Sequence, residues 1–341
     1  MDAEFNGTYI TLGGYIAVDK YRYLYFVILM TLYILILCTN CTIICLIWIH
    51  RNLHEPMYIF IAALSLNSVL FSTAIYPKLF IDVLSQKQTI SYSACMFQYF
   101  IFYSLGMSDI LLLSAMAYDR YVSICKPLQY PTIMANITVT VLLTVAWFLP
   151  ALEVAVAIVI NSKQKLCDFT TDGIFCNSNI FRLYCVKSTF LNAYGLFAML
   201  NIIVVPMIFI LFTYIKIFVI AYHSCVEVRK KATETCLPHL MVLMCCLFLC
   251  IFDVISARLE SDLPKSVHLM SLQIVVYGPL FNPIIYGVKM KEISKHIKRL
   301  LKLLFRGSRG YLEQHTELEP RWKHVIRCDN GKWEKPKVEE E

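Results

Sequence analysis

Apolar residues gather in seven long blocks, at residues 24–49, 57–84, 93–124, 137–160, 191–222, 236–257 and 267–288. About 20 mostly apolar residues in helical form span the hydrocarbon core of a bilayer. Such a helix satisfies its own backbone hydrogen bonds in lipid, whereas the strands of a membrane barrel alternate in polarity over about 10 residues. The pattern therefore predicts an all-α membrane protein, with a seven-transmembrane helix bundle over residues 24–289.

A different pattern follows the last block, at residues 290–305. Lys and Arg fill one helix face, and the other carries apolar residues at helical spacing, namely Met290, Ile293, Ile297, Leu300, Leu301 and Leu304. This arrangement suits a helix that lies on an anionic membrane surface. We expect a short amphipathic surface helix here, with a solvated charged tail as the alternative. Residues 306–341 are polar and are predicted to form a disordered cytoplasmic tail.

Composition agrees with the membrane class. The 341 residues are 58% apolar and 16% charged, whereas soluble proteins average about 25% charged residues. These values exclude intrinsic disorder, collagen and small secreted disulfide scaffolds. The net charge of +7 does not indicate nucleic-acid binding, because so apolar a chain offers no soluble basic face. The sequence has no zinc-protease, serine-hydrolase or phosphate-loop motif, so we predict neither an enzyme nor a cofactor.

Basic residues set the predicted orientation in the membrane. The last block is followed, within the reach of the positive-inside rule, by Lys289, Lys291, Lys295, Lys298, Arg299, Lys302, Arg306 and Arg309. The C-terminus is then cytoplasmic, and an odd number of crossings places residues 1–23 outside the cell, at the plasma membrane. The loop at residues 161–190 carries four basic residues as well, so the loops alone do not follow the rule.

Two further features agree with this orientation. Asn6 begins an Asn-Gly-Thr glycosylation sequon, although such triplets also occur by chance. Cys167, Cys176 and Cys185 fall in a loop that this topology places in oxidising surroundings, where disulfides form. We therefore expect a glycan on Asn6 and disulfides at this end of the bundle.

Charged residues inside a membrane span are costly and are candidates for function. Asp109 and Arg120 lie eleven residues apart in the third block and share one helix face, because successive residues turn by about 100°. Asp119 adjoins Arg120 and could pair with it near the inner end of the span. The alternative is an ordinary charge cluster at a helix end.

Uncharged polar residues also lie well inside the blocks, namely Asn40, Asn67, Ser68 and Asn282. Together with Asp109 they could surround a small cation in a polar cavity at mid-membrane. Each could instead form hydrogen bonds between helices, which contribute about 0.6 kcal/mol on average.

Four motifs carry a family resemblance. They are PMYIF at residues 56–60, MAYDRYVSICKPL at 116–128, KKATETCLPHL at 230–240 and PLFNPIIY at 279–286. With them the chain resembles the odorant (olfactory) receptors of the rhodopsin-like (class A) G-protein-coupled receptor family, over about residues 24–305. The second and third motifs are specific to odorant receptors. The second block and the start of the third are more similar to fish-type receptors than to mammalian ones.

The resemblance implies an activation switch at the inner end of the bundle. Asp119 would hold Arg120 in the resting state and release it to a G protein, and Tyr214 and Tyr286 would then turn inward. The implied switch residues are Asp119, Arg120, Tyr121, Tyr214, Asn282, Pro283 and Tyr286.

The resemblance also implies two disulfides, Cys95–Cys176 and Cys167–Cys185. Three cysteines in one loop allow other pairings, which the sequence alone leaves open.

The sequence departs from the family at its polar centre. Ser68 stands where the family usually has an acid, and Asp109 stands where it usually has Glu. A sodium-like site formed by Asp109, Asn40, Ser68 and Asn282 would thus rest on one carboxylate, and we expect it to bind a cation weakly.

Ligand pockets of the family lie between the third, fifth and sixth spans. The corresponding positions here are Phe102, Tyr103, Gly106, Met107, Asn201, Phe252 and Asp253. An aromatic pocket with a few polar groups suits a small organic ligand, and Asp253 could pair with an amine or with Arg258. Helix packing is the alternative role for each aromatic residue and for Met107.

The resemblance thus implies an odorant receptor that works by a ligand-driven population shift. Its implied partners are a small-molecule odorant, membrane lipid and a heterotrimeric G protein of the stimulatory or olfactory type, which raises cyclic AMP; nucleic acid is not among them. Two alternatives stay open. One is a rhodopsin-like receptor for an internal small ligand, and the other is a small-solute channel or transporter, against which the lack of internal repeats argues.

Overall fold

The computed structural model describes residues 9–15, 21–162, 164–171, 173–186, 189–223, 236–237, 240–245, 248, 272–300 and 302. The chain divides into two compact units, Met1–Lys295 and His296–Glu341. The first unit holds every long helix described below. In the second, residues 296–300 and residue 302 are helical.

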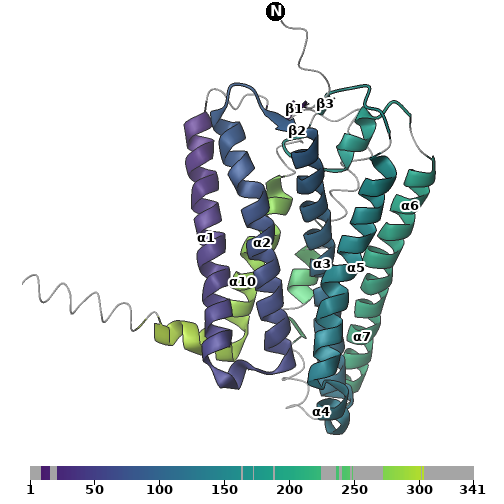
Figure 1. The fold of residues 1–341 in the computed structure, drawn as a ribbon. Helices are drawn as coiled ribbons and strands as arrows, with labels where there is room; N and C mark the ends of the chain where they lie inside the picture. The colour runs from purple at the N-terminus through teal and green to yellow at the C-terminus, as the bar shows by residue number, and fades with distance from the viewer. Residues whose placement is uncertain are drawn as a thin grey trace, which may run out of the picture. The chain divides into compact units, whose positions relative to one another are not determined.

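Long helices form the first unit (Figure 1). They are α1 (Arg22–Ile49), α2 (Pro56–Leu84), α3 (Tyr92–Cys125), α5 (Asn136–Asn161), α6 (Thr189–Met199), α7 (Val205–Tyr222) and α10 (Leu272–Lys289). A π-helical segment, η5 (Leu200–Val204), joins α6 to α7 without a break. Helix α3 contacts α2, α5 and α7, and α10 packs against α1 and α2.

Within the described residues, five helices are long and apolar enough to cross a membrane: Arg22–Ile49, Pro56–Leu84, Tyr92–Cys125, Asn136–Asn161 and Ala193–Tyr222. They coincide with the first five predicted blocks, and α10 with most of the seventh. Most of the sixth block, and the predicted tail at residues 306–341, lie outside the described residues. After the last span, Met290 and Ile293 are buried while Lys291 and Lys295 are exposed, and the surface helix over residues 290–305 stays a prediction.

Local sequence explains several helix features. Pro56 occupies the first turn of α2, where its missing N–H has no helical partner to lose. The Ser91 side chain caps α3 by accepting a hydrogen bond from the Ala94 N–H at 3.3 Å. Hydroxyl groups inside the spans donate to carbonyls four residues back, as Thr39 does to Leu35 at 2.7 Å. These bonds satisfy polar groups that lipid cannot.

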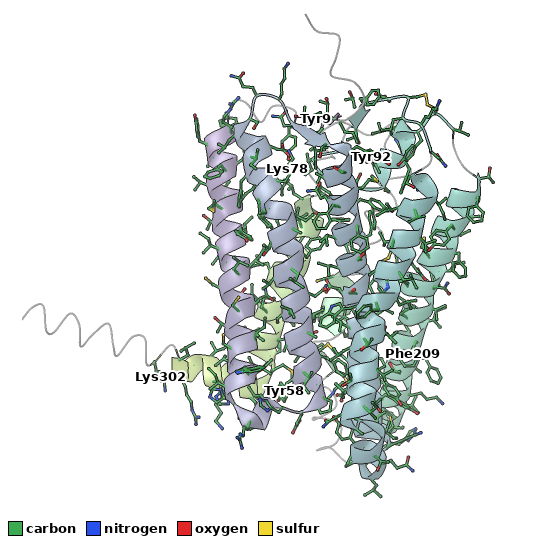
Figure 2. All side chains as sticks on the ribbon, in the orientation of Figure 1. Tyr9, Tyr58, Lys78, Tyr92, Phe209 and Lys302 are labelled. Atoms are coloured by element: carbon green, nitrogen blue, oxygen red, sulfur yellow. A yellow bond between two sulfur atoms is a disulfide. The ribbon has the colours of Figure 1, made fainter. Side chains whose placement is uncertain are left out.

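Large apolar side chains remain exposed on the outside of the first unit. Trp48 on α1, Phe148 on α5 and Phe218 on α7 are 83%, 71% and 74% exposed. A soluble protein rarely leaves such continuous apolar surface in water. Figure 2 shows side chains covering the helices along their full length, with Lys78 near one end of α2 and Tyr58 near the other.

Three short strands cover one end of the first unit, here named the strand end. Strand β1 (Tyr9–Leu12) lies between β2 (Thr89–Ser91) and β3 (Thr170–Thr171). It pairs antiparallel with β2, with Ile10 opposite Ile90, and parallel with β3, with Thr11 opposite Thr170. Ile10 and Leu12 are each 1% exposed. The three-stranded sheet formed by β1, β2 and β3 is here named the lid. The helical pattern of the sequence did not predict it.

Short helices connect the spans at the opposite end, here named the α4 end. The 3-10 helix η2 (Arg51–Leu53) joins α1 to α2. Between α3 and α5 the chain forms η3 (Pro127–Gln129) and the single turn α4 (Tyr130–Ile133). At the strand end, the loop after α5 contains one more 3-10 helix, η4 (Ser178–Leu183).

Candidate functional site

A buried ion pair lies where α3 approaches the α4 end. The Arg120 Nε donates to Asp119 Oδ2 at 2.9 Å, and its Nη2 donates to the same oxygen. Asp119 is fully buried and Arg120 is 8% exposed. A buried charge that loses its partner is strongly destabilised. Arg120 is therefore held in place until another group replaces Asp119.

Tyr130 of α4 binds the other oxygen of the same carboxylate. Its hydroxyl donates to Asp119 Oδ1 at 2.8 Å. Burial, and then the negative charge of Asp119, raise the pKa of the Tyr130 hydroxyl, so it stays protonated and able to donate. Sequence reasoning missed this residue, because nothing in the pattern of residues 127–133 shows which way the loop folds back.

Other predicted switch residues lie on neighbouring helices. Tyr121 of α3 and Tyr214 of α7 pack against one small cluster around the buried Ile217 and Ala221. Asn282 and Tyr286 are buried in α10, at 3% and 1% exposure. Pro283, also buried, lies inside the same helix. The structure thus joins Asp119 to Arg120 and brings Tyr121 and Tyr214 into one cluster.

Asn67 links three helices at the middle of the first unit. Its Nδ2 donates to Asp109 Oδ1 at 2.7 Å and to the Leu105 carbonyl at 2.8 Å. Its Oδ1 accepts from the Trp147 Nε1 of α5 at 3.2 Å. Asn67 therefore serves as a connector between α2, α3 and α5, a role that needs the three-dimensional arrangement to be recognised.

Three of the four residues of the predicted cation site bond to separate partners outside the set. Asn40 donates to the Pro279 carbonyl at 2.9 Å and so joins α1 to α10. Ser68 donates to the Leu64 carbonyl of its own helix at 3.0 Å. Asp109 is bonded to Asn67, and the buried Nδ2 of Asn282 has no hydrogen bond among the described residues. No hydrogen bond between described residues joins two members of this set, and the cation site stays a prediction.

Of the predicted ligand residues on α3, two form part of the packing below the lid. Phe102 is 5% exposed, and its ring centroid lies 4.9 Å from that of Phe175. The Tyr103 hydroxyl accepts a hydrogen bond from the Ser178 N–H at 3.1 Å. Both residues thus position the loop between α5 and α6.

The next turn of α3 is more open. Gly106 is exposed, and a Cβ placed there would meet no atom of the described residues within 4 Å. Met107 packs at the edge of the cluster that contains Cys95 and Cys176. Asn201 is half-buried on η5, which contacts α3. Phe252 and Asp253, which complete the predicted pocket, lie outside the described residues, as does Asn6.

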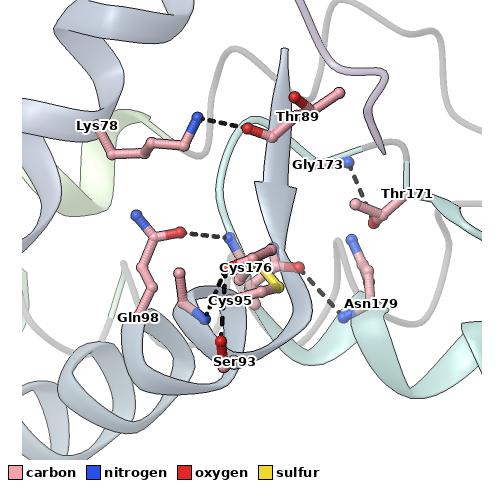
Figure 3. Close-up of a disulfide and its surroundings, with 12 residues drawn as sticks. Lys78, Thr89, Ser93, Cys95, Gln98, Thr171, Gly173, Cys176 and Asn179 are labelled. Atoms are coloured by element: carbon pink, nitrogen blue, oxygen red, sulfur yellow. Dashed lines mark hydrogen bonds between the residues drawn. A yellow bond between two sulfur atoms is a disulfide. The ribbon is translucent and has the colours of Figure 1, made fainter. Parts of the chain in front are cut away.

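Two disulfides hold the strand end together. Cys95 at the start of α3 is bonded to Cys176, with 5.4 Å between their Cα atoms, and Cys167 is bonded to Cys185, with 4.8 Å. The Gln98 Oε1 accepts from the Cys176 N–H at 3.0 Å, beside the first bridge (Figure 3). Both pairings are those that the resemblance implied.

A polar cluster not found by sequence reasoning ties the lid to α2. Lys78 is paired with the buried Asp82 and donates to the Thr89 carbonyl of β2 at 3.0 Å (Figure 3). Tyr15, which follows β1, donates to the Ile174 carbonyl at 2.9 Å. Burial, and then the charge of Asp82, raise the pKa of Tyr15 well above its usual value, which keeps this donor protonated.

Comparison with known proteins agrees with this arrangement. The family model "Olfactory receptor" matches residues 29–303. The chain is 32% identical to olfactory receptor 10J4 of Homo sapiens over 82% of its length and 91% of that protein. It is 33% identical to olfactory receptor 11H6 of Homo sapiens, over 87% of this chain and 90% of that protein. It is 32% identical to olfactory receptor-like protein OLF4 of Canis lupus familiaris, over 87% of this chain and 95% of that protein.

These relatives are mammalian, and the fish-type assignment stays a prediction. A family model over most of the chain, together with the Asp119–Arg120 pair and the Cys95–Cys176 bridge, makes a consistent picture. The chain belongs to the olfactory receptor family and is a multi-pass, non-enzymatic G-protein-coupled receptor of the rhodopsin-like class.

Proposed function

We propose that this receptor senses a small organic odorant in the half of the bundle next to the strand end, and activates a stimulatory or olfactory G protein at the α4 end. The observation that carries the proposal is the buried Asp119–Arg120 pair on α3. The same helix carries the open position at Gly106. Helix α3 therefore connects a place for a ligand to a place for a G protein.

The proposed orientation places the strand end outside the cell. Both disulfides lie at that end, and disulfides persist in oxidising surroundings. Lys289 ends α10, and Lys291 and Lys295 follow it, as the positive-inside rule requires of a cytoplasmic segment. The Asp119–Arg120 pair and Tyr130 would then face the cytoplasm, within reach of a G protein.

The proposed mechanism is a shift between two states. In the resting state, Asp119 is bound by both Arg120 and Tyr130. A ligand moves this equilibrium only by binding the active state more tightly than the resting state. In the active state Arg120 would leave Asp119 and contact the G protein.

A first test fills the predicted ligand site. Gly106→Trp places a large ring in the open space beside α3, and we expect odorant potency to fall by about tenfold or more, the factor that about 1.4 kcal/mol of lost binding gives. Cyclic AMP would be measured in cells that express the olfactory-type G protein and are challenged with pooled odorants, with surface staining in parallel.

Leu152→Trp is the matched control, because Leu152 is 64% exposed on α5. An unchanged dose–response curve for Gly106→Trp at equal surface expression would remove α3 from the ligand site.

A second test removes one bond from the resting switch. Tyr130→Phe deletes the hydroxyl that donates to Asp119, and a hydrogen bond to a charged group contributes about 1.5–3 kcal/mol. We expect basal cyclic AMP to rise by about tenfold or more, since about 1.4 kcal/mol changes an equilibrium by a factor of ten. Tyr23→Phe, at a residue 75% exposed on α1, serves as the control. A basal level that stays the same or falls would contradict this role of Tyr130.

A further inference from the structure

A cavity lies near the strand end of the first unit. It has a volume of about 290 Å³ and is enclosed by α1, α2 and α10, with Tyr15 and Ile174 of the lid region. Ligand pockets have volumes of about 300–1,000 Å³, so this one suits a compact molecule. Of the residues predicted to bind odorant, those that the structure describes (Phe102, Tyr103, Gly106, Met107 and Asn201) do not line it.

Most of the described residues that line this cavity are apolar, and none of them is charged. Leu29 and Leu32 come from α1, Leu79 and Val83 from α2, and Leu272 and Val276 from α10. Burial of a charged group against such a wall is costly. The described lining therefore favours a neutral molecule over fatty acids, phospholipid headgroups and protonated amines.

A few uncharged polar groups complete the lining. They are the hydroxyls of Tyr15, Tyr25 and Tyr277 and the amide of Gln273. The Tyr15 hydroxyl already donates to Ile174. Among the described residues, the Tyr25 hydroxyl and the Gln273 amide make no hydrogen bond through their side chains, so both remain able to bind a ligand. A wall of this kind fixes a ligand by one or two polar contacts.

The cavity opens toward the apolar outside of the first unit. Ile28 on α1 and Tyr277 on α10 both line it and are 45% and 38% exposed. These two helices are in contact. A molecule dissolved in the surrounding membrane would thus enter between α1 and α10.

We infer that the cavity between α1, α2 and α10 binds a neutral, largely apolar small molecule with one hydrogen-bonding group, at a site separate from Gly106. Leu29, Leu79, Val83 and Ile174 belong to one hydrophobic cluster that also contains Phe102 of α3. A bound molecule would therefore stiffen the packing between the lid and α3. Such a ligand would act as a modulator of the receptor.

Photolabelling of the purified receptor tests whether the cavity binds a ligand, and it does not depend on a response to odorant. The full-length receptor, purified in phosphatidylcholine nanodiscs, is irradiated with a diazirine-bearing medium-chain aliphatic alcohol, and labelled peptides are mapped by mass spectrometry. We expect labels within residues 25–32 and 272–277 that excess unlabelled alcohol displaces. Because this readout needs neither G protein nor odorant, its failure would leave the proposed function untouched.

Two variants and a control make the test decisive. Leu29→Trp fills the cavity from a buried position, and Ile28→Trp blocks its mouth from an exposed one. Leu35→Trp adds the same ring to α1 at a residue that is 46% exposed and does not line the cavity. We expect labelling to fall about tenfold, a loss of about 1.4 kcal/mol, in the first two variants alone. Thermal unfolding of each variant checks that it is folded.

Labelling that is equal in all four proteins, or that covers the exposed face of α1 uniformly, would overturn the site in favour of adsorption from the bilayer. Displacement by cholesterol built into the nanodisc would identify a neutral sterol of the bilayer as the occupant. Displacement by unlabelled alcohol but not by cholesterol would identify a molecule delivered from solution. Both displacement results support the site and differ only in the source of its ligand.

Discussion

Replacing Arg120 with alanine is expected to remove the odorant-evoked rise in cyclic AMP. The guanidinium is the group that would leave Asp119 for the G protein, so its loss removes the link between the ligand and the response. Coupling between two sites is typically about 1–3 kcal/mol, or about 5–150-fold. A loss on the order of 100-fold in response at equal surface expression is therefore the expected result.

The experiment must separate a loss of signalling from a loss of folding. In Arg120→Ala the buried Asp119 carboxylate keeps the Tyr130 hydroxyl as its hydrogen-bond donor but loses its positively charged partner. Removing one partner of a buried ion pair destabilises the folded protein by about 3–5 kcal/mol. Surface staining shows how much folded receptor reaches the plasma membrane despite this loss. Arg120→Lys keeps the charge but lacks the planar fork, and we expect it to restore surface expression more fully than signalling. Arg51→Ala, at an exposed arginine of η2, is the control. A full response from well-expressed Arg120→Ala would refute the proposed switch.

Breaking the Cys95–Cys176 bridge is expected to have the largest effect on stability. The bridge joins residues 81 apart in sequence. Closing loops of about 15 to 100 residues lowers the entropy of the unfolded chain and so raises its free energy by about 3–5 kcal/mol. Both cysteines are also buried, at 0% and 1% exposure, in the cluster that holds Ile10 and Leu12. Cys176→Ser should therefore abolish surface expression or lower the unfolding temperature sharply.

Two other cysteine variants calibrate this result. The Cys167–Cys185 bridge spans only 18 residues, so Cys167→Ser should cost less, in line with the smaller loop. Cys41 is free and exposed on α1, and Cys41→Ser should leave both surface staining and unfolding temperature unchanged. If Cys176→Ser unfolds at the same temperature as Cys41→Ser, the bridge does not stabilise the lid as argued here.

The helices were predictable because their signal is local. A membrane helix forms its backbone hydrogen bonds within its own segment of the chain, so a long apolar block suffices to locate it. The structure confirms this for the blocks that became α1, α2, α3 and α5, which begin and end close to the predicted residues. The π-helical segment around Asn201 was not predicted, since no residue pattern in that block marks it.

Contacts between distant parts of the chain were harder to predict. Asn67 and Asp109 stood out as polar residues in separate blocks, whereas Trp147 did not. Their hydrogen bonds depend on how three helices are rotated about their axes. The same holds for Tyr130 and Asp119, which meet only because α4 folds back onto α3. The motif resemblance identified Asp119 and Arg120 as a pair but gave no reason to include Tyr130.

The lid shows a third limit of sequence reasoning. Residues 9–12 alternate between exposed and buried positions, as strands do, but four residues are too few to distinguish a strand from a loop. What makes them a strand is the presence of β2 and β3 on either side. No property of the segment itself reveals those partners.

The central place of β1 also determines when the lid can form during synthesis. Thr11 pairs with Thr89 and with Thr170, which follow it in the chain by 78 and 159 residues. Ribosomes add about 5–20 residues per second, so the second partner appears roughly 8–30 s after β1 itself. Strand β1 therefore waits until α5 and β3 have been made before both of its edges are paired. A nascent chain halted after α3 would carry a two-stranded lid that lacks its third strand.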